Sequence, residues 1–282
     1  MSLSFAATVF SQPNFQGQAM LVGVGTNDRY NPISADQLKG QSVYGTIRSV
    51  DLFGSANAES NLILFGNDDY SGAFFQMSDA RSAGASLWNT TGHAGSMLLV
   101  ASKKPGKSET RISFREQFLT QWDTFLDDKL SGTQASRVGD PTLTWEMFPA
   151  NISYLNPGLT YLKIYQPLHI SMPWYWPDYS ASMTYHIYLY IDGNHHLRGW
   201  GARWECWVEG GAKNGKIHDS LDPQVAAGLS ALQDKVNAQF QLLDLLGPLS
   251  DVYYLPGNQV TDVATGSAIG HTTDDITIVV EH

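Results

Sequence analysis

The first hundred residues consist of short apolar segments that alternate with polar turns. The segments cover residues 7–10, 19–22, 62–65 and 96–100, and the turns between them are rich in Gly, Asn, Asp and Ser. Short apolar runs bounded by turn residues are typical of antiparallel β-strands. The pattern therefore predicts an all-β domain over residues 1–102.

The same region contains an internal repeat. Two aromatic residues five positions apart, followed two positions later by a glycine, occur at 10–17 and again at 65–72. Later in each copy a serine, Ser49 or Ser96, begins the last apolar strand. Two rings at this spacing can stack across a folded hairpin, and the glycine supplies a backbone conformation that a side chain would oppose. One copy would leave an apolar face exposed, whereas two copies can bury that face against each other.

This repeated pattern resembles the signature of the βγ-crystallins, which occurs once in each Greek-key motif. The resemblance covers residues 5–101, about a third of the chain. It implies an N-terminal all-β Greek-key sandwich from a family known chiefly for binding and structural roles. Crystallin-like modules also occur fused to toxin domains, so the resemblance leaves a host-targeting toxin or a defence protein open.

The resemblance also raises the question of calcium. Many microbial members bind calcium through paired motifs in which two Asn or Asp residues precede a final serine by a few positions. Ser49 and Ser96 match that serine, but neither copy has the leading pair. Because calcium prefers several oxygen ligands with carboxylates among them, we expect degenerate sites and weak binding. Asp68 and Asp69 could supply carboxylates from the hairpin corner.

The composition changes after the β region. A polar stretch with Pro-Gly predicts a linker over residues 103–112. Ser113 and Glu116 then have the spacing of a capping box, which predicts the start of a helix. Further on, Asp222 followed by Pro223 predicts the N-cap and first position of a second helix.

Four strands are predicted between these helices, over residues 142–148, 161–166, 183–191 and 199–208. Residues 183–191 and 199–208 form a hairpin pattern that turns at 192–194. Alternation along the second strand of this hairpin assigns one face to Trp200, Ala202, Trp204, Cys206 and Val208. The second helix is expected across the covered face of the sheet, with Cys206 as a small buried residue. Residues 113–282 are therefore predicted to be an α+β domain with an antiparallel sheet packed against helices, of a family not recognised from the sequence.

The net charge and the cysteine content reduce the range of possible partners and metal sites. The formal net charge is −10, and no basic run occurs, which disfavours nucleic acid and anionic membrane surfaces. The single cysteine, Cys206, permits neither an intramolecular disulfide nor a cysteine-based zinc site, and fits a reducing compartment. The eight histidines show no metal-binding spacing.

No targeting or membrane segment is recognisable. The N-terminus lacks a basic start followed by a long apolar stretch, so no signal peptide is predicted. No run reaches the roughly 18–20 apolar residues that a transmembrane helix needs. We expect a chain that is soluble and cytoplasmic as synthesised, and that would need a non-classical route for export.

An aromatic cluster at residues 173–179 is the main candidate for ligand binding. It contains Trp174, Tyr175, Trp176 and Tyr179, and prolines at both ends of the Trp-Tyr-Trp run favour an exposed loop. Exposed Trp and Tyr side chains can stack on a glycan, lie at a lipid head group, or anchor a protein partner. The alternative is a loop that inserts its aromatic side chains into its own core.

Three functions remain open from the sequence. The favoured one is a non-catalytic binding protein, because no catalytic motif is present. The second is an enzyme with a catalytic C-terminal domain and a crystallin-like targeting module, for which the acid–base candidates are His186, His195, Glu205 and Glu209. The third is a structural, stress-resistant protein. The sequence determines neither the ligand nor the oligomeric state.

Overall fold

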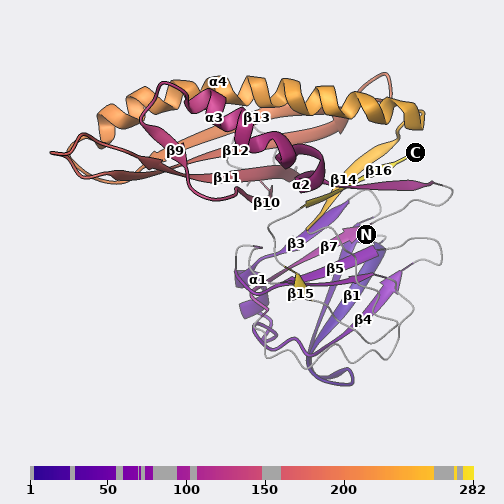
Figure 1. The fold of residues 1–282 in the computed structure, drawn as a ribbon. Helices are drawn as coiled ribbons and strands as arrows, with labels where there is room; N and C mark the ends of the chain where they lie inside the picture. Colours follow the sequence, from indigo (N-terminus) through magenta and orange to yellow (C-terminus); the bar gives the residue numbers. More distant parts are fainter. Residues whose placement is uncertain are drawn as a thin grey trace. The chain divides into compact units, whose positions relative to one another are not determined.

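The structure is a computed structural model. It describes residues 3–25, 29–54, 60–68, 70, 74–78, 94–101, 107–147, 160–256, 270–271 and 276–282. The chain divides into two compact units, each described by itself below (Figure 1). Unit 1 comprises Met1–Glu109 and Gly257–Thr273, and unit 2 comprises Thr110–Pro256 and Asp274–His282. Asp69, residues 91–93, residues 103–106 of the predicted linker and part of the second aromatic pattern lie outside the described residues. The end of the predicted linker is wrong, because residues 109–112 belong to a strand, Glu109–Ser113.

Unit 1 is built from two β-sheets. The first has the order β2 (Gln16–Gly25), β1 (Leu3–Gln12), β4 (Ser49–Gly54). The second has the order β15 (Gly270–His271), β6 (Phe74–Ser78), β5 (Ser60–Phe65), β7 (Ser96–Ala101), β3 (Tyr30–Ile33). Adjacent strands are antiparallel in both. β3 follows β2 in the chain but pairs with β7, so the chain crosses from the first sheet to the second within the first half of unit 1.

Apolar side chains from both sheets form one core. Val9, Val22 and Val50 of the first sheet belong to the same buried cluster as Leu62 and Leu99 of the second. A short helix, α1 (Ala35–Lys39), adds the buried Leu38. It begins with a complete capping box between Ser34 and Gln37, which satisfies two backbone N–H groups at its N-terminus. The predicted burial of one face of each strand is therefore realised between the sheets.

The two predicted hairpin corners both bring their aromatic rings into contact. The ring centroids of Phe10 and Phe15 are 5.6 Å apart at an interplanar angle of 69°, and those of Phe65 and Tyr70 are 6.0 Å apart at 89°. Both pairs have the edge-to-face geometry that aromatic quadrupoles favour. Gly17 has φ +81°, in the left-handed region where glycine avoids the strain that a side chain would add.

A buried serine forms hydrogen bonds to the backbone of each corner in the same way. The Ser49 hydroxyl donates to the Gln12 carbonyl at 2.6 Å and accepts from the Phe15 N–H at 2.9 Å. The Ser96 hydroxyl donates to the Asn67 carbonyl at 2.7 Å and accepts from the Tyr70 N–H at 3.0 Å. Ser49 pairs with Phe10 across the strands and Ser96 with Phe65, so both serines hold equivalent positions. Each hydroxyl thus joins the strand that carries it to the backbone of the corner.

Unit 2 contains a larger antiparallel sheet. Its order is β10 (Thr142–Met147), β11 (Thr160–Ile170), β12 (Tyr179–Ile191), β13 (Leu197–Val208), and β9 (Ala135–Arg137) also pairs with β11. A second sheet has the order β14 (Asp251–Pro256), β16 (Ile276–Glu281), β8 (Glu109–Ser113). The two groups meet where the Tyr254 hydroxyl accepts from the buried Leu189 N–H at 2.8 Å.

Helices cover one face of the larger sheet (Figure 1). α2 (Phe114–Phe118), η1 (Leu119–Gln121) and α3 (Trp122–Leu130) follow one another, and the long α4 (Asn214–Phe240) continues into η2 (Gln241–Leu246). Ser113 is the predicted N-cap, because its hydroxyl accepts from the Glu116 N–H at 3.1 Å. Unit 2 therefore combines antiparallel sheets with helices, as predicted. Of the helices in the described ranges, none has both the length and the apolar character needed to cross a bilayer.

The predicted start of α4 is wrong. The helix begins at Asn214, and Pro223 lies inside it. Ile217 and Leu221 extend the apolar stripe of the helix toward its N-terminus, and Leu221 is buried. This burial outweighs the local start signal, since tertiary packing routinely overrides propensity. Asp222 does not cap a helix here.

The predicted face of Trp200 is also wrong, because β13 contains a bulge. His186 pairs with Arg203 while the next residue, Ile187, pairs with Gly201. Gly201 faces α4, since a Cβ there would lie 2.7 Å from Leu229 Cγ. Trp204 also faces α4, since its indole N–H donates to Asp222 Oδ1 at 3.3 Å. The extra residue reverses the alternation, so Trp200 lies on the face away from the helix.

Candidate functional site: the aromatic loop of unit 2

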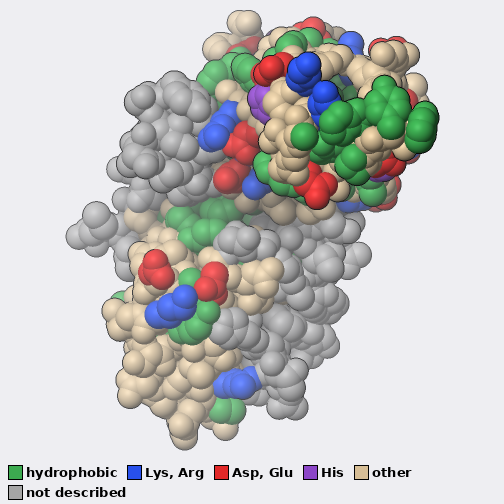
Figure 2. All heavy atoms as spheres, turned by 90° about the vertical axis from the view of Figure 1, so that its left-hand side faces the viewer, with side chains coloured by type: hydrophobic (Ala, Val, Ile, Leu, Met, Phe, Trp, Pro, Cys, Tyr) green, Lys and Arg blue, Asp and Glu red, His purple; other side chains and the backbone are tan. Residues whose placement is uncertain are grey.

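The aromatic loop, residues 171–178, joins β11 to β12. Trp174 is 94% exposed and Tyr175 is 62% exposed, while Trp176 is half-buried. The rings of Trp174 and Tyr175 are 5.7 Å apart and nearly perpendicular. Figure 2 shows hydrophobic side chains gathered on a face of unit 2, with Lys and Arg side chains beside them. The alternative of a loop that buries these side chains in its own core does not hold for Trp174 and Tyr175.

Polar groups hold the backbone of the loop. Asp178 Oδ1 accepts from the Met172 N–H at 2.8 Å, and Asp178 Oδ2 lies 3.3 Å from His169 Nε2. The Trp176 N–H donates to the Pro173 carbonyl at 2.8 Å, which closes a turn within the loop. The exposed rings take no part in these bonds. The loop can therefore keep its conformation while Trp174 and Tyr175 remain in water.

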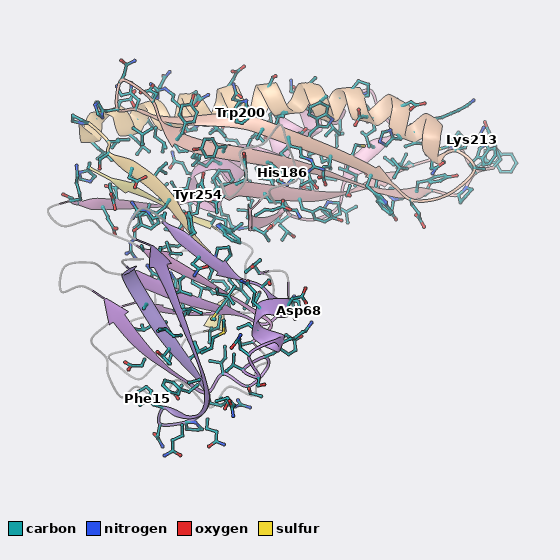
Figure 3. All side chains as sticks on the ribbon, turned by 180° about the vertical axis from the view of Figure 1, so that it is seen from behind. Phe15, Asp68, His186, Trp200, Lys213 and Tyr254 are labelled. Atoms are coloured by element: carbon teal, nitrogen blue, oxygen red, sulfur yellow. The ribbon has the colours of Figure 1, made fainter. Side chains whose placement is uncertain are left out.

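Two lysines at the start of α4 lie beside this loop. Lys213 Nζ lies 4.6 Å from the centroid of the Trp176 ring, within the range of a cation–π interaction. Figure 3 shows Lys213 at the end of the sheet where β11 turns into β12. Within the described ranges, neither Lys213 nor Lys216 forms an ion pair with a carboxylate. Two ammonium groups without such a partner thus lie beside the loop on a chain with a net charge of −10.

A pocket of about 370 Å³ adjoins the aromatic loop. Lys213, Lys216 and Gln224 are among its polar lining residues, and Ile170 and Leu221 are among its apolar ones. None of its lining residues is acidic. The volume lies within the range of small-ligand sites. An apolar floor with two ammonium groups at the rim suits a ligand that carries both an apolar part and an anionic group.

Tyr179, the fourth aromatic candidate, lies in the core. It is 5% exposed, and its hydroxyl accepts from the Lys213 N–H at 3.3 Å. A Cβ on Gly211 would lie 2.7 Å from the Tyr179 ring, so the two approach closely. Tyr179 thus fastens the segment that carries Lys213 to the sheet. The structure brings three of the four aromatic candidates together at the loop and places the fourth beneath it.

The acid–base candidates do not form one site. His186 is buried, and its Nε2 lies 2.5 Å from Glu146 Oε2. Glu205 pairs with Arg203 at 2.6 Å on the same face of the sheet. Glu209 Oε2 accepts from the Ser180 N–H at 3.1 Å near one end of the hairpin. His195 lies at the opposite end.

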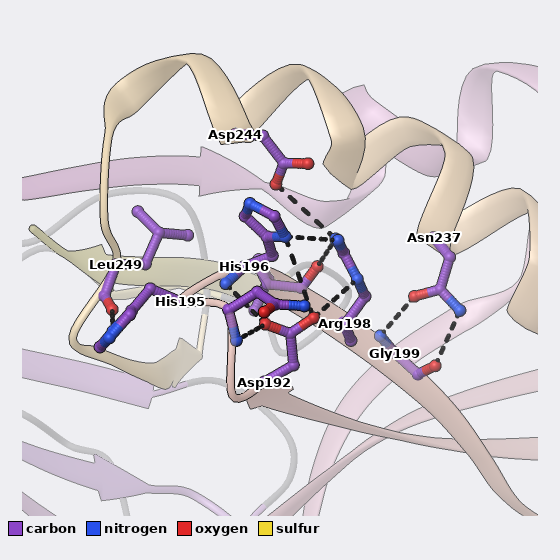
Figure 4. Close-up of polar contacts among 10 residues, drawn as sticks. Asp192, His195, His196, Arg198, Gly199, Asn237, Asp244 and Leu249 are labelled. Atoms are coloured by element: carbon purple, nitrogen blue, oxygen red, sulfur yellow. Dashed lines mark hydrogen bonds and ion pairs between the residues drawn. The ribbon is translucent and has the colours of Figure 1, made fainter.

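His195 belongs to the turn between β12 and β13 (Figure 4). It has φ +62°, and its Nδ1 lies 3.1 Å from the Leu249 carbonyl. In the same turn, Asp192 Oδ2 lies 3.2 Å from Arg198 Nε, and Arg198 Nη1 lies 3.6 Å from Asp244 Oδ1 in η2. Hydrogen bonds from the backbone N–H groups of His196 and Asn194 lower the pKa of Asp192. These contacts give the turn a structural role.

Glu146 was not predicted as a candidate. Burial alone would raise its pKa, but the hydrogen bond to His186 and the charges of His186, Lys163 and Arg203 outweigh it, so the pKa lies below its usual value. Glu146 faces His186 because both lie on strands that flank β11. Sequence alone carries no signal for this pair, since it depends on strand order. Lys213 and Lys216 were missed for the same reason, because the sequence separates them from the aromatic loop by the whole hairpin.

The candidate calcium ligands have other partners in the described residues. The hydroxyls of Ser49 and Ser96 are buried and bonded at the corners, as described above. Asp68 Oδ2 lies 3.1 Å from Lys39 Nζ, and Asp68 Oδ1 accepts a hydrogen bond from the Tyr44 hydroxyl at 2.7 Å. Asp69 lies outside the described residues. Calcium binding stays a prediction.

Cys206 is half-buried on the side of β13 that faces α4. Burial, followed by the charge of Asp222, raises the pKa of its thiol to about 11. The thiolate is the nucleophilic form of cysteine. The side chain is therefore a poor nucleophile at neutral pH.

Comparison with protein-family models, with curated proteins and with solved structures returns no match for this chain. Function is therefore inferred from the residues themselves. The aromatic loop, the two lysines and the pocket are the features that need a partner to explain them.

Proposed function

We propose that this chain is a non-catalytic binding protein that attaches to a phospholipid surface through the aromatic loop. The exposure of Trp174, at 94%, is the observation that carries the proposal. Aromatic side chains bury roughly 150–250 Å² each. At about 25 cal/mol per Å², moving one such side chain out of water is worth on the order of 5 kcal/mol as an upper bound. Trp and Tyr are also the side chains that favour the head-group region of a bilayer.

The surroundings of the loop support a head group that carries phosphate. Lys213 and Lys216 have no carboxylate partner among the described residues and stand beside a pocket with an apolar floor. A phosphate at the rim would meet two ammonium groups, while an acyl part would meet Ile170 and Leu221. The net charge of −10 opposes strongly anionic membranes. A zwitterionic lipid such as phosphatidylcholine therefore fits this chain best.

A glycan is the second candidate ligand, and polar contacts distinguish the two. Sugar recognition needs hydrogen-bonding groups beside the aromatic ring. At the aromatic loop, the Asp178 carboxylate is already bonded to the Met172 N–H and paired with His169. Among the polar residues that line the adjoining pocket, Lys213 and Lys216 are the charged ones. This set favours phosphate over neutral hydroxyl groups.

Kinship of unit 1 with the βγ-crystallins is part of the same proposal, with each half of unit 1 as a Greek-key motif. Support comes from the repeated corner, in which an aromatic pair and a buried serine recur at equivalent positions. Further support comes from strand order, because β2-β1-β4 and β6-β5-β7 match and β3 crosses to the other sheet. In this proposal unit 1 is a stable module that accompanies the binding loop of unit 2.

Vesicle binding tests the attachment. Wild type is expected to sediment with phosphatidylcholine vesicles, and the double variant Trp174→Ala/Tyr175→Ala to lose at least about tenfold in affinity, because roughly 1.4 kcal/mol corresponds to a factor of ten. Trp207→Ala is the matched control, since Trp207 is also exposed but lies on β13. Equal binding of wild type and the double variant would refute the proposal.

A second pair of variants tests the lysines. Lys213→Glu is expected to weaken vesicle binding. Lys235→Glu is expected to leave vesicle binding unchanged, although Lys235 Nζ also lies over an aromatic ring, 5.3 Å from the centroid of Phe125. The same proteins are applied to a glycan array. Glycan binding that depends on Trp174, without vesicle binding, would assign the loop to sugars instead.

A further inference from the structure

Three metal-ligating side chains of unit 2 converge between β13 and α4. They are Cys206 on the strand and His218 and Asp222 on the helix, and their ligand atoms all lie within 4.8 Å of one another. His218 and Asp222 are four residues apart, which places them on the same face of a helix. All three are half-buried, so an ion from solvent can reach them.

We infer that Cys206, His218 and Asp222 form a binding site for a transition-metal cation, and that zinc is the ion their donor set fits. Thiolate, imidazole and carboxylate are the three protein ligand types of zinc sites. Calcium and magnesium prefer oxygen ligands throughout. Three protein ligands leave one tetrahedral position for water, as in zinc sites that stay open to a ligand.

Trp204 orients one of the three ligands. Its indole N–H donates to Asp222 Oδ1 at 3.3 Å, which leaves the other carboxylate oxygen for a cation. Such outer contacts fix the direction of a ligating group and raise metal affinity. Trp204 is therefore a positioning residue in this site.

One feature of the fold that the sequence did not predict completes the site. Trp204 and Cys206 lie on the face of β13 that was expected beneath the helix, and the early start of α4 at Asn214 puts His218 on the helix above them. With Asp222 as an N-cap, His218 would precede the helix and leave its face. The sequence argued against a cysteine-based zinc site because one cysteine cannot supply several thiolates, and the proposed site differs from that expectation by combining one thiolate with an imidazole and a carboxylate. The inference is independent of the proposed attachment to phospholipid.

Cobalt serves as the spectroscopic probe of the site. Chelator-treated full-length protein is titrated with Co²⁺, and a sulfur-to-cobalt charge-transfer band is expected to saturate at one ion per chain and to vanish when Zn²⁺ is added. Cys206→Ser is expected to abolish the band. His218→Ala and Asp222→Asn are each expected to weaken zinc binding by at least about tenfold, and Trp204→Phe by roughly tenfold with the band retained.

His195→Asn is the matched control, because His195 is exposed and Asn tolerates the left-handed backbone of that position. Its zinc affinity should equal that of wild type. Absence of a charge-transfer band in wild type overturns the inference. So does zinc uptake that is undiminished in Cys206→Ser, or a band that survives unchanged in His218→Ala and Asp222→Asn.

A measurement on wild type alone keeps the test valid if a variant fails to fold. Zinc binding is expected to slow alkylation of Cys206, the only thiol of the chain, and to raise the melting temperature, because a ligand that binds the folded state stabilises it. An alkylation rate that stays unchanged at saturating zinc would overturn the inference.

Discussion

Hairpin ends that carry aromatic residues behave in opposite ways in the two units. At the corners of unit 1, the rings of Phe10 and Phe15 contact each other, and a buried serine bonds to the backbone of the corner. At the aromatic loop of unit 2, Asp178 bonds to the backbone, and Trp174 projects into water. The same class of side chain therefore serves folding in one place and remains available for a partner in the other.

This difference predicts whether a mutation changes the stability of the fold or the binding of a partner. A corner residue contributes to the free energy of folding because its contacts are made within the unit. A loop residue whose contacts are made with water contributes to binding instead. Substitutions that separate these two effects test the comparison directly.

Phe65→Ala is expected to cause the largest loss of stability. Phe65 is buried and contacts both Tyr70 and Phe74. Removal of a buried phenyl ring costs about 3–5 kcal/mol of unfolding free energy. Urea unfolding followed by circular dichroism measures it. A loss below roughly 1 kcal/mol, the central value for point mutations in general, would show that the corner contacts are dispensable.

Ser49→Ala and Ser96→Ala are expected to cause the next largest loss of stability. Each leaves a backbone N–H and a carbonyl of the corner without its hydroxyl partner, which costs about 1–3 kcal/mol. Faster hydrogen exchange of the Phe15 or Tyr70 amide reports the loss locally. Ser180→Ala, at an exposed position, should change neither amide. Unchanged exchange in the serine variants would contradict the fastening role.

Gly17→Ala and Gly132→Ala form a matched pair with a smaller effect. The two glycines have φ values of +81° and +79°, so alanine is strained at both, by about 1–2 kcal/mol. A Cβ at Gly17 would also lie 2.4 Å from Ser11 Oγ, which accepts from the Gln18 N–H, whereas nothing lies within 4 Å at Gly132. Gly17→Ala should therefore be the more destabilising by about 1 kcal/mol. Equal losses in thermal or urea unfolding would mean that the corner is not tightly packed.

Trp174→Ala is expected to change stability least. An exposed side chain without internal bonds contributes within about 0.5 kcal/mol. Tyr179→Ala, at the buried aromatic of the same region, should cost several times more. Both are measured by urea unfolding. A large loss in Trp174→Ala would place its ring in a folding role and remove the contrast between the corner and the loop.

Local patterns predicted much of both units. The ring pairs at the corners follow from aromatic residues five positions apart, and the β12–β13 hairpin follows from two apolar runs around a short turn. The Ser113 N-cap also follows from a spacing of three residues. In each of these cases the decisive interactions connect residues that are close in sequence. The flanking prolines favoured an exposed loop and left insertion of its rings into the core open, and the structure exposes Trp174 but buries Tyr179.

The predictions from the sequence were wrong where the structure depends on contacts between residues that are far apart along the chain. The start of α4 depends on the surface against which Leu221 packs, and the face of Trp200 depends on a bulge that lets Gly199 and Gly201 lie against α4. The Glu146–His186 pair needs the order of three strands.

Spacing along the chain thus determined the repeated corners and the hairpin, because short-range sterics and hydrogen bonding suffice for them. Only the tertiary structure decided which side chains meet across elements, because the burial of apolar faces sets helix ends and strand registers. The convergence of Cys206 with His218 and Asp222, and of Lys213 with Trp176, belongs to this second group.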